Sequence, residues 1–340
     1  MTAENDALSY SPITAAETLL ALDNVSPEQA TRRIPLPTGF MPLDEVIGGG
    51  LRAGELVVLG GPSGVGKTIF ALQLARNVAR SESGAHALYI CYEHEPDHLL
   101  TRLICLESAD LLPVEQALTI RRLDEMGRNA SGDLGVISAL RGTRRYEPVI
   151  SRVAEYAQRL HLARPGRLSA TLSGVERWTS DLVNSVQAPT LVVIDYLQKI
   201  TTDERIDSED ERMTEVIQGL KDLALNTGTR ILAIAAADRV GLKSPRMRLS
   251  DLRGSSAVQY EADIGLVVNN KHAIVSREHL LNDPVHAEEM RGWLVLSIEK
   301  NRAGMAAVNL EFKLDAAHFR LHTAGKYVRE RLVDQHTVMA

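Results

Sequence analysis

Short apolar runs alternate with longer amphipathic stretches along most of the chain, from about residue 38 to residue 321. The apolar runs predict strands at residues 55–60, 86–92, 190–196, 230–236, 263–268 and 293–298, followed by a hairpin at 308–312 and 318–321. Helical spacing predicts a helix that follows residue 68, and further helices near residues 96–107, 146–162, 174–186 and 214–226. Strands that alternate with helices are typical of a mostly parallel sheet with crossover helices. The pattern therefore predicts an α/β fold with a C-terminal β-hairpin.

The two ends of the chain lack this alternation. Residues 1–11 predict disorder, and residues 12–22 predict a helix with one apolar stripe, formed by Ala15, Leu19 and Leu20. A polar stretch separates this helix from the rest, so the helix packs either on its own domain or on a neighbouring subunit. We expect an N-terminal region with a linker-like helix at 1–36, one α/β domain at 37–323 and a polar tail at 324–340.

A glycine-rich segment lies between the first strand and the helix after it. It consists of Gly61, Pro62, Ser63, Gly64, Val65, Gly66, Lys67 and Thr68, and it matches the pattern G-x-x-x-x-G-K-[ST]. Glycines let the backbone wrap an anion, and the positive end of the helix dipole adds to the attraction. In such a loop Lys67 reaches the β- and γ-phosphates and the Thr68 hydroxyl binds Mg²⁺. The alternative is a glycine-rich turn without a ligand, but the strand–loop–helix context favours binding of a nucleoside triphosphate.

Two predicted strands end in carboxylates. Asp195 closes the apolar run TLVVID, and an Asp at the carboxyl end of a buried parallel strand lies where open α/β sheets bind ligands. In phosphate-loop enzymes that Asp orders the Mg²⁺ shell. Glu93 follows the strand at 86–92, where it would orient or deprotonate an attacking water. The alternative for Glu93 is a solvated glutamate at a strand end.

The run His94-Glu95-Pro96-Asp97-His98 also matches the zinc pattern H-E-x-x-H. That pattern needs both histidines one turn apart on a regular helix, together with a third ligand. Pro96 marks the start of a helix between the two histidines, so they need not share a face. We therefore set aside the interpretation as a metal-dependent hydrolase.

Composition narrows the classes of partner and compartment. Hydrophobic residues make up 44% of the chain and aromatic residues only 4%, so base stacking on aromatic platforms is disfavoured. The net charge of −6 excludes a globally basic nucleic-acid binder, and any contact with DNA requires a local basic cluster. The two cysteines, Cys91 and Cys105, indicate a reducing compartment, and we expect Cys91 in the core. Since no secretory or membrane-spanning run is present, we expect a cytoplasmic protein.

Two cations lie near the end of the last long strand, in the run SIEKNRAG. Lys300 and Arg302 alternate along it, so both side chains would project in the same direction. They form either a solvated edge or a pair that reaches the γ-phosphate of an adjacent subunit as an arginine finger.

The order of these motifs over residues 37–321 resembles the C-terminal RecA-like ATPase domain of DnaB-type replicative helicases. The resemblance is carried by PTGFMPLDEVIGGGL, GGPSGVGKT, EPDHLLTRLI, LVVIDYLQ, LSDLRGSSAVQYEAD and EKNRAG. It implies a RecA-like P-loop NTPase that forms a hexameric ring or a helical homo-oligomer. It further implies that Lys67, Thr68 and Asp195 bind ATP and Mg²⁺, that Glu93 is the catalytic base, and that Lys300 and Arg302 act in trans.

The resemblance also implies a contact with single-stranded DNA. The segment 239–259 would correspond to a loop that faces a central channel, with the basic residues Arg239, Lys243, Arg246, Arg248 and Arg253. The alternative is a solvated loop. The helix at 12–22 would correspond to the linker helix by which such rings hook neighbouring subunits.

Two departures from the family bear on function. Only about 36 residues precede the ATPase segment, where the helicases carry a helical N-terminal domain. Ala236 stands where the family has a glutamine that senses the γ-phosphate, and alanine cannot hydrogen-bond to a phosphate or a water. We expect an ATP-hydrolysing, helicase-like motor on single-stranded DNA. The alternative is an ATP-gated assembly or regulatory protein that oligomerises without unwinding DNA and has a protein partner still unknown.

Overall fold

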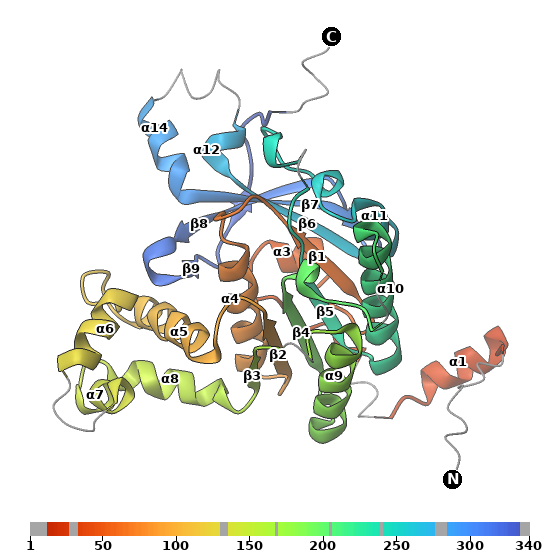
Figure 1. The fold of residues 1–340 in the computed structure, drawn as a ribbon, viewed down its shortest axis with the longest axis horizontal. Coiled ribbons are helices and arrows are strands. Elements are labelled where there is room, and N and C mark those ends of the chain that lie inside the picture. The colour runs from red at the N-terminus through yellow and green to blue at the C-terminus, as the bar shows by residue number, and fades with distance from the viewer. Residues whose placement is uncertain are drawn as a thin grey trace.

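The computed structural model describes residues 12–26, 33–129, 135–166, 169–203, 206–238, 241–275 and 284–333. One sheet of ten strands forms the centre of this part of the chain (Figure 1). Its strand order is β10-β8-β7-β6-β1-β5-β4-β2-β3, with β9 paired to β8. The strands from β6 to β3 in this order run parallel, and β7, β8 and β10 pair antiparallel. The predicted, mostly parallel α/β fold is therefore confirmed.

The predicted strands lie close to their predicted ranges, and strands at residues 160–163 and 326–327 were not predicted. The parallel strands are β1 (Leu56–Gly60), β2 (His86–Cys91), β3 (Leu160–Ala163), β4 (Thr190–Asp195), β5 (Arg230–Ile234) and β6 (Ile264–Asn270). The antiparallel part consists of β7 (Trp293–Asn301), β8 (Val308–Asp315), β9 (Arg320–Leu321) and β10 (Lys326–Tyr327). The predicted hairpin is formed by β8 and β9, with Leu314 opposite Leu321.

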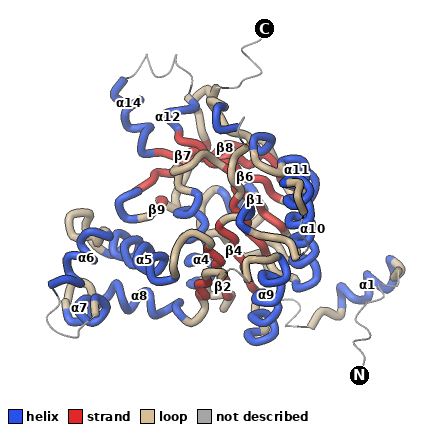
Figure 2. Tube along the Cα trace, viewed as in Figure 1, coloured by secondary structure: helices blue, strands red, loops and turns tan. Residues whose placement is uncertain are grey.

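Helices cover both faces of the sheet (Figure 2). The longer helices are α1 (Ala15–Asp23), α4 (Lys67–Arg80), α5 (Pro96–Leu111), α6 (Ile120–Asn129), α8 (Glu147–Ala157), α9 (Leu172–Val186) and α10 (Glu209–Thr227). The shorter ones are α3 (Leu43–Val46), α7 (Val136–Gly142), α11 (Ser255–Glu261), α12 (Lys271–Ile274) and α14 (Pro284–Glu289). Short 3₁₀ turns are η1 (Leu197–Lys199), η2 (Gly241–Lys243), η3 (Leu249–Asp251), η4 (Met290–Gly292) and η5 (Ala316–His318).

Strand β1 supplies one row of side chains to each face. Val57 and Leu59 belong to the core that includes α4, α5 and α8. Leu56 and Val58 belong to the core that includes α9, α10 and α11. Successive residues of a strand point to opposite faces, so a strand buried on both sides must be apolar throughout. This explains why the predicted strands read as continuous apolar runs.

The predicted helix at 146–162 differs from the observed structure at its C-terminal end. Helix α8 ends at Ala157, and the next apolar residues form the edge strand β3, which pairs in parallel with β2. Leu160 and Leu162 pack against the core from this strand. Their alternate spacing is that of a strand, but two apolar residues are too few to mark where the helix ends, and pairing with β2 decides the boundary.

The C-terminal segment also differs from the predicted tail at 324–340. Strand β10 pairs with β8, and Leu332 forms a bridge with Val275. The buried Lys271 ammonium contacts Glu330 at 2.6 Å and so holds this segment to α12. Residues 326–332 are therefore tied to the domain and do not form the predicted tail, and residues 334–340 lie outside the described residues.

Helix α1 projects away from the sheet (Figure 1) and buries none of its residues. A capping box between Thr14 and Glu17 begins it, as expected for a helix that starts near residue 12. The side chains of Leu19 and Leu20 are 66% and 64% exposed. Packing on its own domain, one of the two predicted alternatives, is not observed. Residues 1–11, for which we predicted disorder, lie outside the described residues.

Candidate nucleotide site

The glycine-rich segment forms a loop between the end of β1 and the start of α4. Gly61 has φ of 150° and a side-chain carbon there would lie 2.5 Å from the Val268 carbonyl oxygen, so only glycine fits. Gly66 caps α4 in the left-handed region, with φ of 107°. The first amides of the 14-residue helix α4 therefore face the loop, which is the arrangement that binds anions.

Lys67 is held across this loop. Its Nζ donates hydrogen bonds to the Gly61 and Pro62 carbonyls at 2.7 and 2.8 Å. Burial lowers the pKa of Lys67, while the charges of Asp195 and Glu93 oppose that shift. The ammonium is thus anchored beside the first residues of the loop and close enough to both carboxylates to feel their charge.

Asp195 lies at the end of β4, where its side chain receives two hydroxyl groups. The Thr68 and Tyr89 hydroxyls both donate to Asp195 Oδ2 at 2.9 Å. Burial raises the pKa of Asp195, and these hydrogen bonds oppose that shift. Mg²⁺ prefers hard oxygen ligands, and the adjacent Thr68 hydroxyl and Asp195 carboxylate supply them. The two residues therefore fit the predicted role of holding Mg²⁺.

A cavity of about 540 Å³ joins these groups. Its lining includes the predicted residues Gly61, Ser63, Gly64, Gly66, Lys67, Thr68, Glu93 and Asp195. Glu93 is exposed and enters the cavity from the loop after β2. Val65 instead packs in the core with 8% exposure. Most of the predicted phosphate-binding set is thus brought to one place, because the loop after β1 and the ends of β2 and β4 meet there.

Sequence reasoning missed several residues that line this cavity, among them Arg102 and Phe319. The guanidinium of Arg102, on α5, lies 5.1 Å from the centre of the Phe319 ring, and both side chains line the cavity. The sequence feature that could have indicated Arg102 is its place on the predicted helix near residues 96–107, which follows Glu93. Phe319 gave no signal, because its place depends on the fold of the C-terminal strands.

The two histidines of the zinc-like run do not lie on one regular helix, although their ring centres are 4.9 Å apart. Helix α5 begins at Pro96, so His94 precedes the helix and only His98 is within it. The His94 Nε2 atom lies 3.0 Å from an Arg102 nitrogen, which occupies the ring position that a metal would need. Among the described residues, no group of three or more metal-binding side chains is placed to hold an ion.

Lys300 and Arg302 lie far from the phosphate-binding loop of their own chain. Lys300 pairs with Gly265 at the start of β6, whose first residues lie beside the start of β1. The glycine-rich loop follows the other end of β1. Neither cation lines the 540 Å³ cavity. Within one chain, therefore, the cations and the phosphate-binding loop lie at opposite ends of the parallel strands.

The predicted DNA-contacting residues do not form one exposed basic surface. Arg246 is buried, with 6% exposure, and its Nη2 donates to Asn309 Oδ1 at 2.7 Å. Arg248 pairs with Glu299 at 3.0 Å, and Arg253 pairs with Glu209 at 2.9 Å and lines the nucleotide cavity. Lys243 is exposed. This corrects the prediction for Arg246, since packing against β7 and β8 buries it; Arg239 lies outside the described residues.

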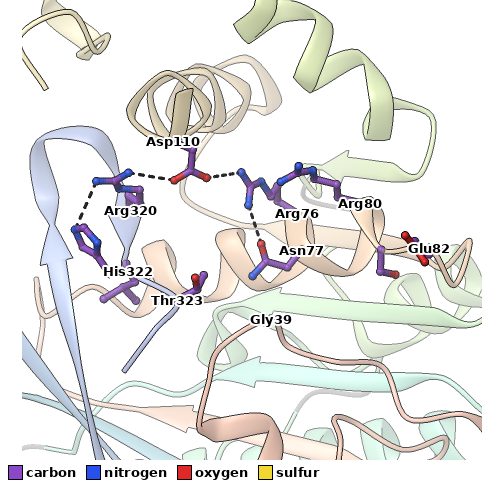
Figure 3. A pocket seen from close by; sticks show the side chains of 11 residues that line it. Gly39, Arg76, Asn77, Arg80, Glu82, Asp110, Arg320, His322 and Thr323 are labelled. Carbon is purple, nitrogen blue, oxygen red and sulfur yellow. Dashed lines mark hydrogen bonds and ion pairs between the residues drawn. The ribbon is translucent and has the colours of Figure 1, made fainter. Parts of the chain in front are cut away.

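A second hollow of about 490 Å³ lies between α4, α5 and the end of β9 (Figure 3). Its arginines are engaged with acidic side chains of the same chain. Asp110 contacts Arg76 at 2.8 Å and Arg320 at 3.1 Å, and Arg76 also pairs with the fully buried Glu107 at 2.6 Å. This network joins three elements and is a structural feature rather than a nucleotide site.

Comparison with known proteins agrees with this architecture. A family model described as an AAA domain matches residues 28–237. The replicative DNA helicase DnaB of Leifsonia xyli is 24% identical over 281 residues, which cover 80% of this chain and 55% of that protein. Replicative DNA helicase DnaC of Bacillus subtilis is 27% identical over 234 residues, 67% of this chain and 46% of that protein. The chain thus spans about half the length of these curated relatives.

Solved structures support the fold. One of them, an isolated ATPase domain, superposes with a TM-score of 0.71 at 17% identity, and the match covers 92% of this chain and 99% of that one. A DnaB-like replicative helicase, solved in a study of its interactions with primase, gives a TM-score of 0.67 over 92% of this chain and 67% of that one. Within the described ranges, none of the helices is long and apolar enough to cross a membrane. The chain belongs to the AAA domain family, is similar in sequence to DnaB replicative helicases, and has the RecA-like fold of a P-loop ATPase.

Proposed function

We propose that the protein is an ATP-hydrolysing motor that works as a homo-oligomer, a hexameric ring or a helical assembly, on single-stranded DNA. One observation carries the proposal: the phosphate-binding loop and the cations Lys300 and Arg302 lie at opposite ends of the parallel strands. Such a chain completes its hydrolytic site only when a second copy supplies the cations. Repetition of that contact gives a closed ring or a helical filament.

The reaction is in-line attack of water on the γ-phosphate. Lys67 and the amides at the start of α4 hold the phosphates in place. Glu93 orients the attacking water and accepts its proton. Bound Mg²⁺, held by Thr68 and Asp195, would neutralise charge on the phosphate oxygens. Arg302, together with Lys300, stabilises the remaining charge from the next subunit.

A second function, ATP-gated assembly without DNA movement, is favoured by the end of β5. Ala236 and Ala237 line the nucleotide cavity, at the place where the resemblance to DnaB-type helicases leads us to expect a glutamine. The Ala236 amide donates to Gln198 Oε1 at 3.0 Å, so this segment is tied to the end of β4. In addition, most described members of the basic set are engaged within the chain. Both features weaken the case for coupling to DNA.

ATP hydrolysis measured with and without single-stranded DNA distinguishes the two functions. The motor predicts at least severalfold stimulation by DNA, with Lys67→Ala as the inactive blank. Lys243→Ala should reduce that stimulation, since Lys243 is exposed, unlike the other described members of the basic set. Hydrolysis without DNA should stay unchanged. Robust hydrolysis that is indifferent to DNA would overturn the motor and support ATP-gated assembly.

A further inference from the structure

We infer that Asp263 and the C-terminal end of α11 position Lys300 and Arg302 for the neighbouring subunit's site, and that α11 connects them to the subunit's own nucleotide cavity. The inference rests on the proposed role of these cations in trans. It gives a positioning role to Asp263, the last residue of the run LSDLRGSSAVQYEAD, to which the sequence alone assigns no role. It also gives a route by which one nucleotide site could influence the next.

Asp263 is itself fixed to the start of the central strand β1. Its Oδ2 accepts the Leu56 amide at 2.8 Å and Lys221 Nζ at 2.7 Å, while its backbone amide donates to the Leu56 carbonyl at 2.8 Å. The side chain is 11% exposed. Because β1 holds the Oδ2 atom of this carboxylate, the position of its Oδ1 atom is fixed as well.

That second oxygen is directed at Arg302. Arg302 Nη1 lies 3.3 Å from Asp263 Oδ1, and the Arg302 amide donates to the Asp263 carbonyl at 2.9 Å. Asp263 thus fixes both the backbone and the guanidinium of the same residue. Even so, the Arg302 side chain is 48% exposed, which leaves it accessible to a second copy of the chain.

The end of α11 provides the other contacts. Arg302 Nη2 donates to the Tyr260 carbonyl, and Lys300 Nζ donates to the carbonyls of Gln259 and Tyr260. Carbonyls in the last turn of a helix lack intrahelical partners and carry the negative end of the helix dipole, so they favour cations. Both cations therefore converge on the same helix end.

The start of α11 borders the nucleotide cavity. The N-cap residue of α11 is Gly254, and Arg253 directly before it lines the cavity. The Arg253 amide donates to the Ala236 carbonyl at 3.0 Å, which ties this segment to the end of β5. Helix α11 has seven residues, which corresponds to about 10 Å, and it lies beside α10 (Figure 1). A shift at the cavity end of so short a helix is transmitted to the carbonyls that hold Lys300 and Arg302.

Mixing experiments with the assembled protein test the positioning role. Lys67→Ala subunits cannot use their own site but keep Asp263, Lys300 and Arg302, whereas Asp263→Asn subunits keep their phosphate-binding loop. Each variant alone should hydrolyse ATP at least about tenfold more slowly than the unmodified protein. A mixture should recover activity, because Lys67→Ala subunits supply correctly placed cations to the intact sites of their neighbours.

Kinetics of the single variants supply a second readout. For Asp263→Asn we expect the loss in kcat, with KM for ATP within about threefold of the original, and partial recovery in Asp263→Glu. Asp222→Asn is the matched control: it makes the same substitution at an exposed carboxylate of α10 that contacts neither cation, so kcat should stay within about threefold. Asp263→Ser replaces Asp263→Asn if the latter does not fold, as judged by thermal melting and binding of a fluorescent ATP analogue.

The outcomes separate this inference from the proposed function. Arg302→Ala mixed with Lys67→Ala tests the trans role by itself, and failure to recover activity there would sink that role. Suppose instead that this mixture recovers activity. If the mixture of Asp263→Asn with Lys67→Ala then does not recover, or if Asp263→Asn alone hydrolyses ATP normally, the trans role stands and positioning by Asp263 is wrong.

Discussion

At the scale of single residues, the convergence of two hydroxyls on one oxygen of Asp195 organises the site. Thr68 comes from the first turn of α4 and Tyr89 from the middle of β2. The Tyr89 side chain is fully buried, and its hydroxyl is fixed at 2.9 Å from the carboxylate. Groups behind a metal-binding carboxylate orient it and affect metal affinity. Tyr89 is therefore a positioning residue for Asp195.

Tyr89→Phe removes this hydrogen bond and keeps the ring in the core. We expect the Mg²⁺ concentration for half-maximal ATP hydrolysis to rise by about tenfold, because supporting residues of this kind affect metal affinity by roughly 10–100-fold. Tyr92→Phe is the matched control, since the buried Tyr92 hydroxyl has no hydrogen-bond partner among the described residues. An unchanged Mg²⁺ dependence in Tyr89→Phe would contradict the positioning role.

At the scale of elements, buried ion pairs fix the helices on one face of the sheet. Arg76 of α4 makes two hydrogen bonds to Glu107 of α5, at 2.6 and 2.7 Å, and the two side chains are 4% and 0% exposed. Asp110 extends the network to Arg320 of β9 (Figure 3). These contacts hold α5, which carries Arg102 into the nucleotide cavity, against the helix that begins at the phosphate-binding loop.

Glu107→Gln leaves the Arg76 charge buried without its main counter-charge. Breaking such a pair costs about 3–5 kcal/mol, so the free energy of unfolding should fall by that amount in denaturant titrations. Glu155→Gln is the control, because Glu155 is 57% exposed and lies 3.9 Å from Arg80. Exposed pairs contribute about 0–1 kcal/mol. Equal effects of the two substitutions would show that the buried pair adds no more than a surface pair.

At the scale of the whole molecule, the two ends of the parallel strands carry the two sets of residues that the proposed reaction needs. One end presents the phosphate-binding loop with Asp195 and Glu93, and the other presents Lys300 and Arg302. An arrangement of this kind favours head-to-tail association. Helix α1, with its exposed leucines projecting from the sheet, is a second surface that a neighbouring copy would cover.

Leu19→Asp tests whether α1 packs on a neighbour. We expect the oligomer to dissociate to smaller species in light scattering at the same protein concentration, since a charge in an apolar contact is costly to bury. The control is Leu225→Asp, which changes a 58% exposed leucine on α10. If Leu19→Asp assembles as the unmodified protein does, α1 is not a subunit contact.

The sequence by itself determined the features that depend on neighbouring residues. The phosphate-binding loop, Asp195 at a strand end and the central parallel strands follow from local spacing and from the apolar runs that strands buried on both faces require. Tertiary structure alone decided the features that depend on residues distant in the chain, such as the pairing of β3 with β2 and of β10 with β8. Three side-chain hydrogen bonds show this: Tyr89 to Asp195, Arg246 to Asn309 and Arg302 to Asp263. Their partners are 106, 63 and 39 positions apart in the chain. Their partners are set by packing between elements, and no local pattern encodes them.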